Sequence, residues 1–258
     1  MRTGSVAPYP ARVRLSVIGG SGGIPGDGRP CSGYVVSASG FGLLIDPGYG
    51  VATALSGAKA PSFDAVLVTH AHPDHCADLN PLLRAVAWAD PPRDPLVVYA
   101  LPGALDAVLA LDRPQLLAGS YRLEAFEAGD MLWIGPFTIE TALLPHPRPN
   151  AGLRLAADGA TLVYTGDCGP SDELVHLARR ADALLAEASY AAAVPDELLG
   201  ALSSATDAGR QAAAAGVGRL VLTHLMPATD PDAAMAAARS SFAGPIDVAR
   251  PGFAVELP

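Results

Sequence analysis

Four side chains that are able to bind metal ions stand close together in the stretch THAHPDHCADL, which runs from residue 69 to residue 79. They are His70, His72, Asp74 and His75. The stretch before them, DAVLVT, is almost continuously apolar, which is typical of a strand buried on both faces. The stretch after them, ADLNPLLRAVAWA, has apolar residues at helical spacing. The cluster is therefore expected where a buried strand passes into a helix.

The rest of the chain repeats this alternation of strands and helices. Short apolar runs separated by glycine and proline fill the first half, and an Asp158-Gly159 pair between two later runs predicts a hairpin. No break in composition divides residues 1–258, so we expect one α/β domain with two packed sheets and helices outside them. Helices are expected over residues 104–111, 171–180, 205–215 and 231–242.

Composition limits the kind of protein this is. Half of the 258 residues are hydrophobic and 17% are charged, which is typical of a compact globular chain. The net charge of −9 argues against long nucleic acids as partners, because proteins that bind them usually carry a basic surface. The three cysteines predict no disulfide framework. Neither a membrane-spanning apolar run nor a secretory leader is recognisable, so no membrane partner and a cytoplasmic location are expected.

Three further side chains follow predicted strands, as the histidine cluster does. They are His146 after ETALLP, Asp167 after TLVYTG and His224 after RLVLT. Strand ends at one rim of a sheet converge, and imidazole with carboxylate, without thiolate, suits zinc or a similar ion at a catalytic site. The set is too large for one tetrahedral ion and fits two ions that share a carboxylate and activate a water. His176, within a predicted helix, is instead expected to be an ordinary surface or core residue.

HAHPDH resembles the HxHxDH signature of the metallo-β-lactamase superfamily, and His146, Asp167 and His224 follow in the superfamily's order. The segments VIGGSGGIP, LLIDPG and LVYTGDCG are similar to the branch that contains ribonuclease Z and small phosphodiesterases. The resemblance implies an αββα sandwich, two divalent metal ions (Zn²⁺, with Mn²⁺ or Fe as alternatives) and a homodimer.

By position in the motifs, the resemblance also implies a role for each ligand. Asp167 bridges the two ions, and Asp74 also orients the attacking water and passes a proton to the leaving group. The first ion is then held by His70, His72 and His146, and the second by Asp74, His75 and His224.

Two features depart from the ribonuclease Z pattern. Bacterial ribonuclease Z has a long RNA-gripping arm before the bridging aspartate, but here only twenty residues separate His146 from Asp167. The branch also has a further histidine, proposed to protonate the leaving oxygen, and its position is occupied here by Leu202. Its glutamate partner corresponds to Glu187, which is either a remaining catalytic group or a carboxylate that caps backbone amides. Hydroxyls that could donate weakly in place of the histidine are those of Ser203, Ser204 and Thr206.

Other residues near the motifs have alternative interpretations. The glycine-rich loop GGSGGIPG either borders the site or only permits a tight connection. Cys76 and Cys168 flank ligands but are expected to be small packing residues. Arg148 and Arg154 either meet an anionic substrate or are solvated surface residues.

Three functions remain open from the sequence. The first is a phosphodiesterase for a small phosphoester such as a cyclic nucleotide, which the motifs favour. The second is a hydrolase of acyl bonds in a lactone, thioester or β-lactam, whose leaving groups need less help from an acid. The third is a non-catalytic metal-binding protein, against which the complete ligand set argues.

Overall fold

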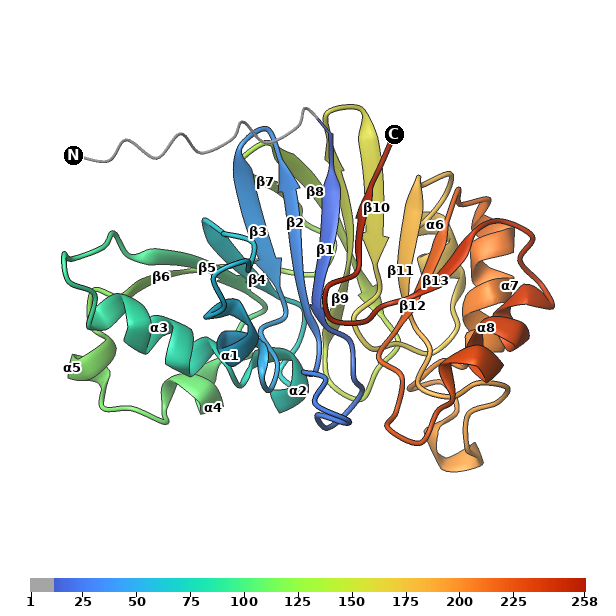
Figure 1. The fold of residues 1–258 in the computed structure, drawn as a ribbon, viewed down its shortest axis with the longest axis horizontal. Helices are drawn as coiled ribbons and strands as arrows, with labels where there is room; N and C mark the ends of the chain where they lie inside the picture. Colours follow the sequence, from blue (N-terminus) through green and yellow to red (C-terminus); the bar gives the residue numbers. More distant parts are fainter. Residues whose placement is uncertain (1–11) are drawn as a thin grey trace.

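A computed structural model describes residues 12–258 and shows two seven-stranded sheets packed face to face, with helices on the outer sides (Figure 1). The first sheet has, in spatial order, β14 (Ala254–Glu256), β1 (Arg14–Gly19), β2 (Gly33–Ala38), β3 (Phe41–Ile45), β4 (Ala65–Val68), β5 (Leu96–Ala100) and β6 (Tyr121–Ala125). The second has β13 (Ile246–Val248), β12 (Leu220–Thr223), β11 (Ala183–Glu187), β10 (Ala160–Tyr164), β9 (Asn150–Ala157), β8 (Phe137–Leu144) and β7 (Met131–Ile134).

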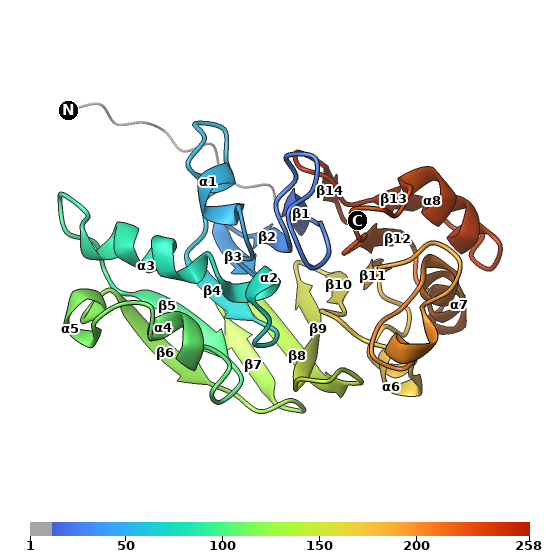
Figure 2. The same cartoon turned by 90° about the horizontal axis from the view of Figure 1, so that it is seen from below.

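The helices fall into two groups, one beside each sheet (Figure 2). The first group is α1 (Val51–Leu55), α2 (Pro73–Cys76), α3 (Leu79–Ala87), α4 (Asp106–Leu109) and α5 (Pro114–Leu117). The second is α6 (Asp172–Leu177), α7 (Ala205–Ala215) and α8 (Pro231–Arg239), with the short 3₁₀ helix η1 (Asp196–Leu198) before α7. This arrangement confirms the expected αββα sandwich. None of these helices, within residues 12–258, has the length and apolarity needed to span a bilayer.

Apolar side chains from the two facing sheets form the main core. Strand β4, predicted from DAVLVT, is buried at every residue. The rings of Tyr34 and Tyr164 meet across the sandwich with centroids 4.9 Å apart. A second apolar cluster lies between the second sheet and helices α6, α7 and α8, where alanines such as Ala212 and Ala238 let the helices approach closely.

The predicted hairpin and most helices are confirmed, but several helix ends are wrong. Strands β9 and β10 pair about Asp158 and Gly159, both with positive φ, as a type I′ turn requires. Helix α4 is shorter than expected, and α8 ends before the predicted residue 242. Helix α6 is capped by Ser171 as expected but ends at Leu177, and Arg180 beyond it has a positive φ that no helix continues through.

Candidate metal centre

All seven candidate ligands lie at or just beyond the ends of strands, on one edge of the sandwich. His70, His72, Asp74 and His75 are in the loop after β4 and in α2. His146 follows β8, Asp167 follows β10 and His224 follows β12. The sheets therefore bring together residues from four separate segments of the chain. His176 lies exposed on α6, outside both groups that the ligands form.

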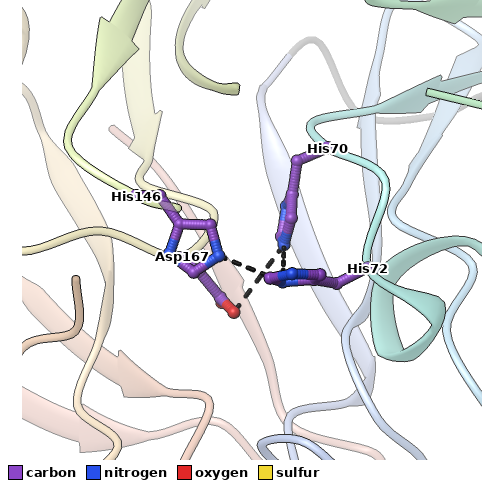
Figure 3. Close-up of side chains that lie close together, drawn as sticks. All are labelled: His70, His72, His146 and Asp167. Atoms are coloured by element: carbon purple, nitrogen blue, oxygen red, sulfur yellow. Dashed lines mark hydrogen bonds and ion pairs between the residues drawn. The ribbon is translucent and has the colours of Figure 1, made fainter. Parts of the chain in front are cut away.

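The first group comprises His70, His72, His146 and Asp167 (Figure 3). The Nδ1 atom of His72 is 3.2 Å from Nε2 of His70 and 3.0 Å from Nε2 of His146. Asp167 Oδ2 is 3.7 Å from His70 Nε2. Ligand atoms about 2.05 Å from a tetrahedral ion stand roughly 3.3 Å apart, so these distances match atoms that converge on one ion.

The second group comprises Asp74, His75, His224 and again Asp167. Asp167 Oδ1 is 3.1 Å from His75 Nε2 and 3.3 Å from His224 Nε2. Asp74 Oδ2 is 3.1 Å from His224 Nε2. One oxygen of Asp167 therefore faces each group, which is the geometry of a carboxylate that bridges two ions.

Two atoms in the second group are buried without a hydrogen-bond partner. They are Nε2 of His75 and Oδ1 of Asp167, which lie 3.1 Å apart but, within residues 12–258, make no hydrogen bond of acceptable geometry with each other or with another group. Leaving a buried polar atom unpaired costs about 1–3 kcal/mol, and more when it is charged. A divalent cation bound to both atoms removes that cost, so the residues present fit a metal ion at this position.

The ring nitrogens that face away from the groups have partners of their own. Nδ1 of His70 contacts Thr69 Oγ1 at 3.0 Å, and Nδ1 of His146 contacts the carbonyl oxygen of Ala201 at 2.9 Å. Nδ1 of His75 contacts Asp46 Oδ2 at 2.8 Å, and Nδ1 of His224 contacts Ser189 Oγ at 2.9 Å. Such contacts fix the tautomer in which Nε2 is free to bind a metal.

Asp46 is a residue that the sequence interpretation missed as part of the site. It is fully buried and also accepts hydrogen bonds from the backbone N–H and hydroxyl of Thr69, at 2.8 and 2.7 Å, and from the Tyr164 hydroxyl at 2.9 Å. These contacts occupy both of its oxygens, so Asp46 orients His75 rather than binding an ion. Asp46 directly follows β3, in LLIDPG, so the position at a strand end that identified the other residues could have identified Asp46 as well.

The electrostatic environment keeps the carboxylates ionised. Burial would raise the pKa of Asp74, but a hydrogen bond to His224 and the charge of His75 hold it well below its ordinary value. Burial likewise opposes the ionisation of Asp167, whose pKa His224 and His75 hold far below the usual range. Burial lowers the pKa of His70, which therefore remains a neutral ligand. Both aspartates and His70 are thus ready to bind a cation at neutral pH.

Glu187 is buried beside the metal ligands and makes several hydrogen bonds. It accepts them from the backbone N–H groups of Cys168 and Ser203 and from the Ser189 hydroxyl. Burial, followed by the negative charge of Asp167, raises the pKa of Glu187 to about 8 in the metal-free protein. Positive charge bound at Asp167 would remove the second of these causes. These are the contacts of a carboxylate that caps backbone amides, and its catalytic role stays a prediction.

The glycine-rich loop between β1 and β2 lies beside the centre, at the same edge as α2 in Figure 1. The backbone N–H of Gly23 donates to Asp74 Oδ2 at 2.9 Å. A Cβ on Gly22 would stand 2.5 Å from the carbonyl oxygen of His224, so only glycine fits there. Both interpretations of the loop are therefore correct, because it borders the site and also needs glycine for a close approach.

The two arginines after His146 differ in their surroundings. Arg154 donates to the carbonyl oxygens of Leu177 and Arg179 at 2.7 and 3.1 Å, so it caps the end of α6. Arg148 is exposed in the turn between β8 and β9. Neither arginine is shown to meet a substrate.

All three cysteines are buried and unpaired, as the packing interpretation expects. Burial raises the pKa of the Cys31 and Cys76 thiols to about 12. Because only the thiolate reacts readily, we expect the native protein at pH 8 to be alkylated by iodoacetamide roughly a thousand-fold more slowly than the protein in guanidinium chloride. Mass spectrometry of the alkylated chain measures this ratio. Rapid labelling of Cys31 or Cys76 in the native protein would contradict it.

Comparison with known proteins agrees with the geometry. The family model described as "Beta-lactamase superfamily domain" matches residues 42–225. The chain belongs to the β-lactamase superfamily, and its fold is the metallo-β-lactamase fold. Membership implies that the protein is a metallo-hydrolase that binds divalent metal, and the ligand groups described above are consistent with this.

Two relatives resemble nearly the whole chain. The probable metallo-hydrolase YhfI of Bacillus subtilis is 31% identical over 248 residues, which cover 95% of this chain and 100% of YhfI. Its crystal structure superimposes with a TM-score of 0.86, covering 95% of this chain and 99% of that one. The ribonuclease Z of Mycobacterium bovis is 31% identical over 278 residues, covering 95% of this chain and 98% of its own.

A more distant structure shares the fold alone. A diphosphatase from the PhnP family is 17% identical and has a TM-score of 0.73, with 96% of this chain and 98% of that chain covered.

Proposed function

We propose that this metallo-hydrolase is a dinuclear phosphodiesterase acting on a small phosphoester such as a cyclic nucleotide. The observation that carries the proposal is Asp167, which directs one oxygen at each ligand group. Two bound divalent ions, Zn²⁺ first and Mn²⁺ or Fe as alternatives, would polarise the phosphoryl oxygen and activate a water. The relatives named ribonuclease Z and PhnP-family diphosphatase, both of which act on phosphate groups, favour a phosphoester over other substrates.

The size of the substrate follows from the segment between His146 and Asp167. In the described part of the chain this segment consists of strands β9 and β10 and their turns, with no additional domain. An RNA-gripping arm of the ribonuclease Z type has no place there, and the net charge is −9. Both features support a compact substrate rather than a transfer RNA precursor. The homodimer and the cytoplasmic location implied by resemblance and composition remain predictions.

Asp74 is the residue proposed to act as the general base and general acid. Its carboxylate is 7% exposed, ionised at neutral pH and fixed by Gly23 N–H and His224 on its Oδ2 atom. In this position it can orient the attacking water by accepting a proton from it and later return that proton to the leaving oxygen.

Hydrolysis of an acyl bond is the alternative function, and one observation favours it. Leu202 stands where the branch has its acidic histidine, and the contacts of Glu187 are already taken by two backbone amides and Ser189. An alkoxide that leaves from a phosphodiester would therefore have a weaker proton donor here than in ribonuclease Z.

A substrate panel distinguishes these functions. The protein is loaded with Zn²⁺ or Mn²⁺, its metal content is measured, and it is assayed on bis(p-nitrophenyl) phosphate, a cyclic nucleotide, a thioester and a lactone. Turnover of the two phosphodiesters supports the proposal, whereas turnover of only an acyl substrate supports the alternative. Two bound ions with no turnover of any substrate would indicate a non-catalytic protein.

Restoring the missing imidazole tests, by gain of function, whether the lack of a general acid limits the hydrolysis of phosphodiesters. Leu202 lies next to Ala201, whose carbonyl oxygen contacts His146, so residue 202 is within the wall of the centre. We expect Leu202→His to raise kcat on a phosphodiester with a poor leaving group by about a hundred-fold. This is the lower end of the rate enhancement that general acid catalysis typically gives. The rate on bis(p-nitrophenyl) phosphate, whose leaving group is good, should change much less.

Leu199→His is the matched control, because Leu199 belongs to the same loop but is 65% exposed. An equal gain in both variants, or no gain in Leu202→His with its metal content intact, would show that a missing acid does not limit this reaction.

A further inference from the structure

We propose that Ser189 is a positioning residue that fixes His224 for metal binding, with Glu187 as the shared acceptor behind it. The inference rests on the metal-binding role of His224, not on the identity of the substrate. Neither Ser189 nor this role for Glu187 follows from the motifs.

The hydrogen-bond distances define a chain of three buried side chains. Ser189 Oγ is 2.9 Å from Nδ1 of His224 and 2.8 Å from Oε1 of Glu187. All three residues are at most 3% exposed, so water does not replace either contact. A hydroxyl has one proton to donate and lone pairs to accept with.

The direction of donation follows from what surrounds Glu187. Its Oε2 faces the backbone N–H of Cys168, and its Oε1 faces the backbone N–H of Ser203 at 3.2 Å. Because each oxygen of Glu187 already faces a backbone N–H donor, the ionised side chain acts as the acceptor for Ser189 as well. The Ser189 oxygen is then left to accept from Nδ1–H of His224, so that Nε2, which is directed at Asp74 and Asp167, is the ring nitrogen left to bind a metal ion.

His224 is a ligand that needs such support from its neighbours. Its backbone has a φ of 56°, in the left-handed region that a residue with a side chain rarely adopts. Conformations of this kind cost about 1–3 kcal/mol and persist only where the surroundings hold them. The backbone of Ser189 helps to stabilise the segment that follows His224. Its carbonyl oxygen accepts hydrogen bonds from Met226 N at 3.1 Å and from Thr229 Oγ1 at 2.7 Å.

Glu187 extends the same support to the other ligands of the second half of the chain. The Cys168 amide that it binds belongs to the residue directly after Asp167. The Ser203 amide belongs to the loop in which Ala201 accepts from Nδ1 of His146. Glu187 thus contacts the segment that carries Asp167 and two segments whose residues support His146 and His224, and its proposed place in the mechanism is to hold them rather than to transfer a proton.

The first test measures the tautomer of His224 in the unsubstituted, metal-free protein. Two-bond ¹H–¹⁵N correlation spectra distinguish Nδ1–H from Nε2–H imidazoles, and assignment uses a His224→Gln sample. We expect His224 to carry a proton on Nδ1, whether or not Nε2 is also protonated. A proton on Nε2 alone would overturn the proposal, because Ser189 would then donate to His224.

The second test measures metal affinity with Zn²⁺ alone, by competition with a chromogenic chelator. Ser189→Ala should weaken Zn²⁺ binding at the group that contains His224 by about 10–100-fold, the usual effect of removing a partner behind a ligand. Ser189→Thr, which keeps the hydroxyl, should restore most of the affinity. Ser120→Ala is the matched control, since Ser120 is also a buried serine, and its hydroxyl donates to the Leu117 carbonyl oxygen before β6, away from the candidate ligands.

Several results would count against the role. Unchanged Zn²⁺ affinity in Ser189→Ala would overturn it, as would an equal loss in Ser120→Ala or a failure of Ser189→Thr to recover affinity. Thermal unfolding of each metal-free variant separates a local effect from a general loss of folding. Because these measurements do not involve turnover, they hold even if the phosphodiesterase proposal fails.

Discussion

Replacing Asp167 by asparagine is expected to lower kcat/KM by at least about a thousand-fold, which corresponds to roughly 4 kcal/mol of lost transition-state stabilisation. The reason is that Asp167 directs Oδ2 at His70 and Oδ1 at His75 and His224, so one carboxylate serves both ligand groups. An amide keeps the shape of the side chain but removes its charge, and its nitrogen cannot bind a cation. Both the metal content, measured by mass spectrometry, and the rate should fall.

Asp158→Asn provides the matched control for this prediction. Asp158 is on the same β9–β10 hairpin but is exposed at its tip, where it accepts from the Ser39 hydroxyl at 2.9 and 3.0 Å. Asparagine tolerates the positive φ of that turn, so metal content and activity should remain as in the unsubstituted protein. An Asp167→Asn protein that holds two ions and keeps most of its activity would show that the carboxylate does not bridge.

The position of the candidate site could be predicted because each segment that carries candidate ligands follows an apolar run. A run such as DAVLVT is long enough to identify β4, and the carboxyl ends of β4, β8, β10 and β12 lie at the same edge of the sandwich. His146, Asp167 and His224 therefore join the histidine cluster although they are far from it in the chain. The chemistry of the set, imidazole and carboxylate without thiolate, then indicates the kind of ion.

The partners behind the ligands could not be predicted in the same way. Ser189 lies 35 residues before His224, which it contacts. The Ala201 carbonyl lies 55 residues after His146, which it contacts. A serine hydroxyl or a backbone carbonyl has no distinctive sequence signal, because every chain has many of them. The left-handed conformation of His224 is also invisible in the sequence, since tertiary contacts rather than the residue type impose it.

Short edge strands such as β13 and β14 give little sequence signal for a different physical reason. Strands β13 and β14 have three residues each and are partly exposed, so no period of two develops in them. Helix ends were displaced because contacts with distant parts of the chain help to decide where a helix ends. Helix α6, for example, ends where Arg154 from β9 donates to the carbonyl oxygens of Leu177 and Arg179, a contact between distant segments.

Removing the carboxylate of Asp46 is expected to have the largest effect on stability. In the metal-free protein we expect Asp46→Ala to lower the free energy of unfolding by about 3–5 kcal/mol, the usual cost of breaking a buried charged pair. Asp46 is 0% exposed and receives hydrogen bonds from Thr69, His75 and Tyr164, so its loss leaves buried donors without a partner. Its φ of 52° adds a further cost for alanine, which lacks the polar side chain that makes this conformation tolerable.

Urea unfolding of the metal-free unsubstituted protein, Asp46→Ala and Asp64→Ala measures how far each substitution lowers the free energy of unfolding. Asp64 is in the loop before β4, is exposed and accepts one hydrogen bond, from Gly42 N–H at 2.8 Å. Its replacement should cost only about 1 kcal/mol, the net value of one ordinary hydrogen bond. Equal losses in the two variants would mean that Asp46 does not organise the ligands. A large loss confined to Asp46→Ala would show that the metal centre is held in place before any ion binds, because its histidines are anchored by the protein and not by the metal.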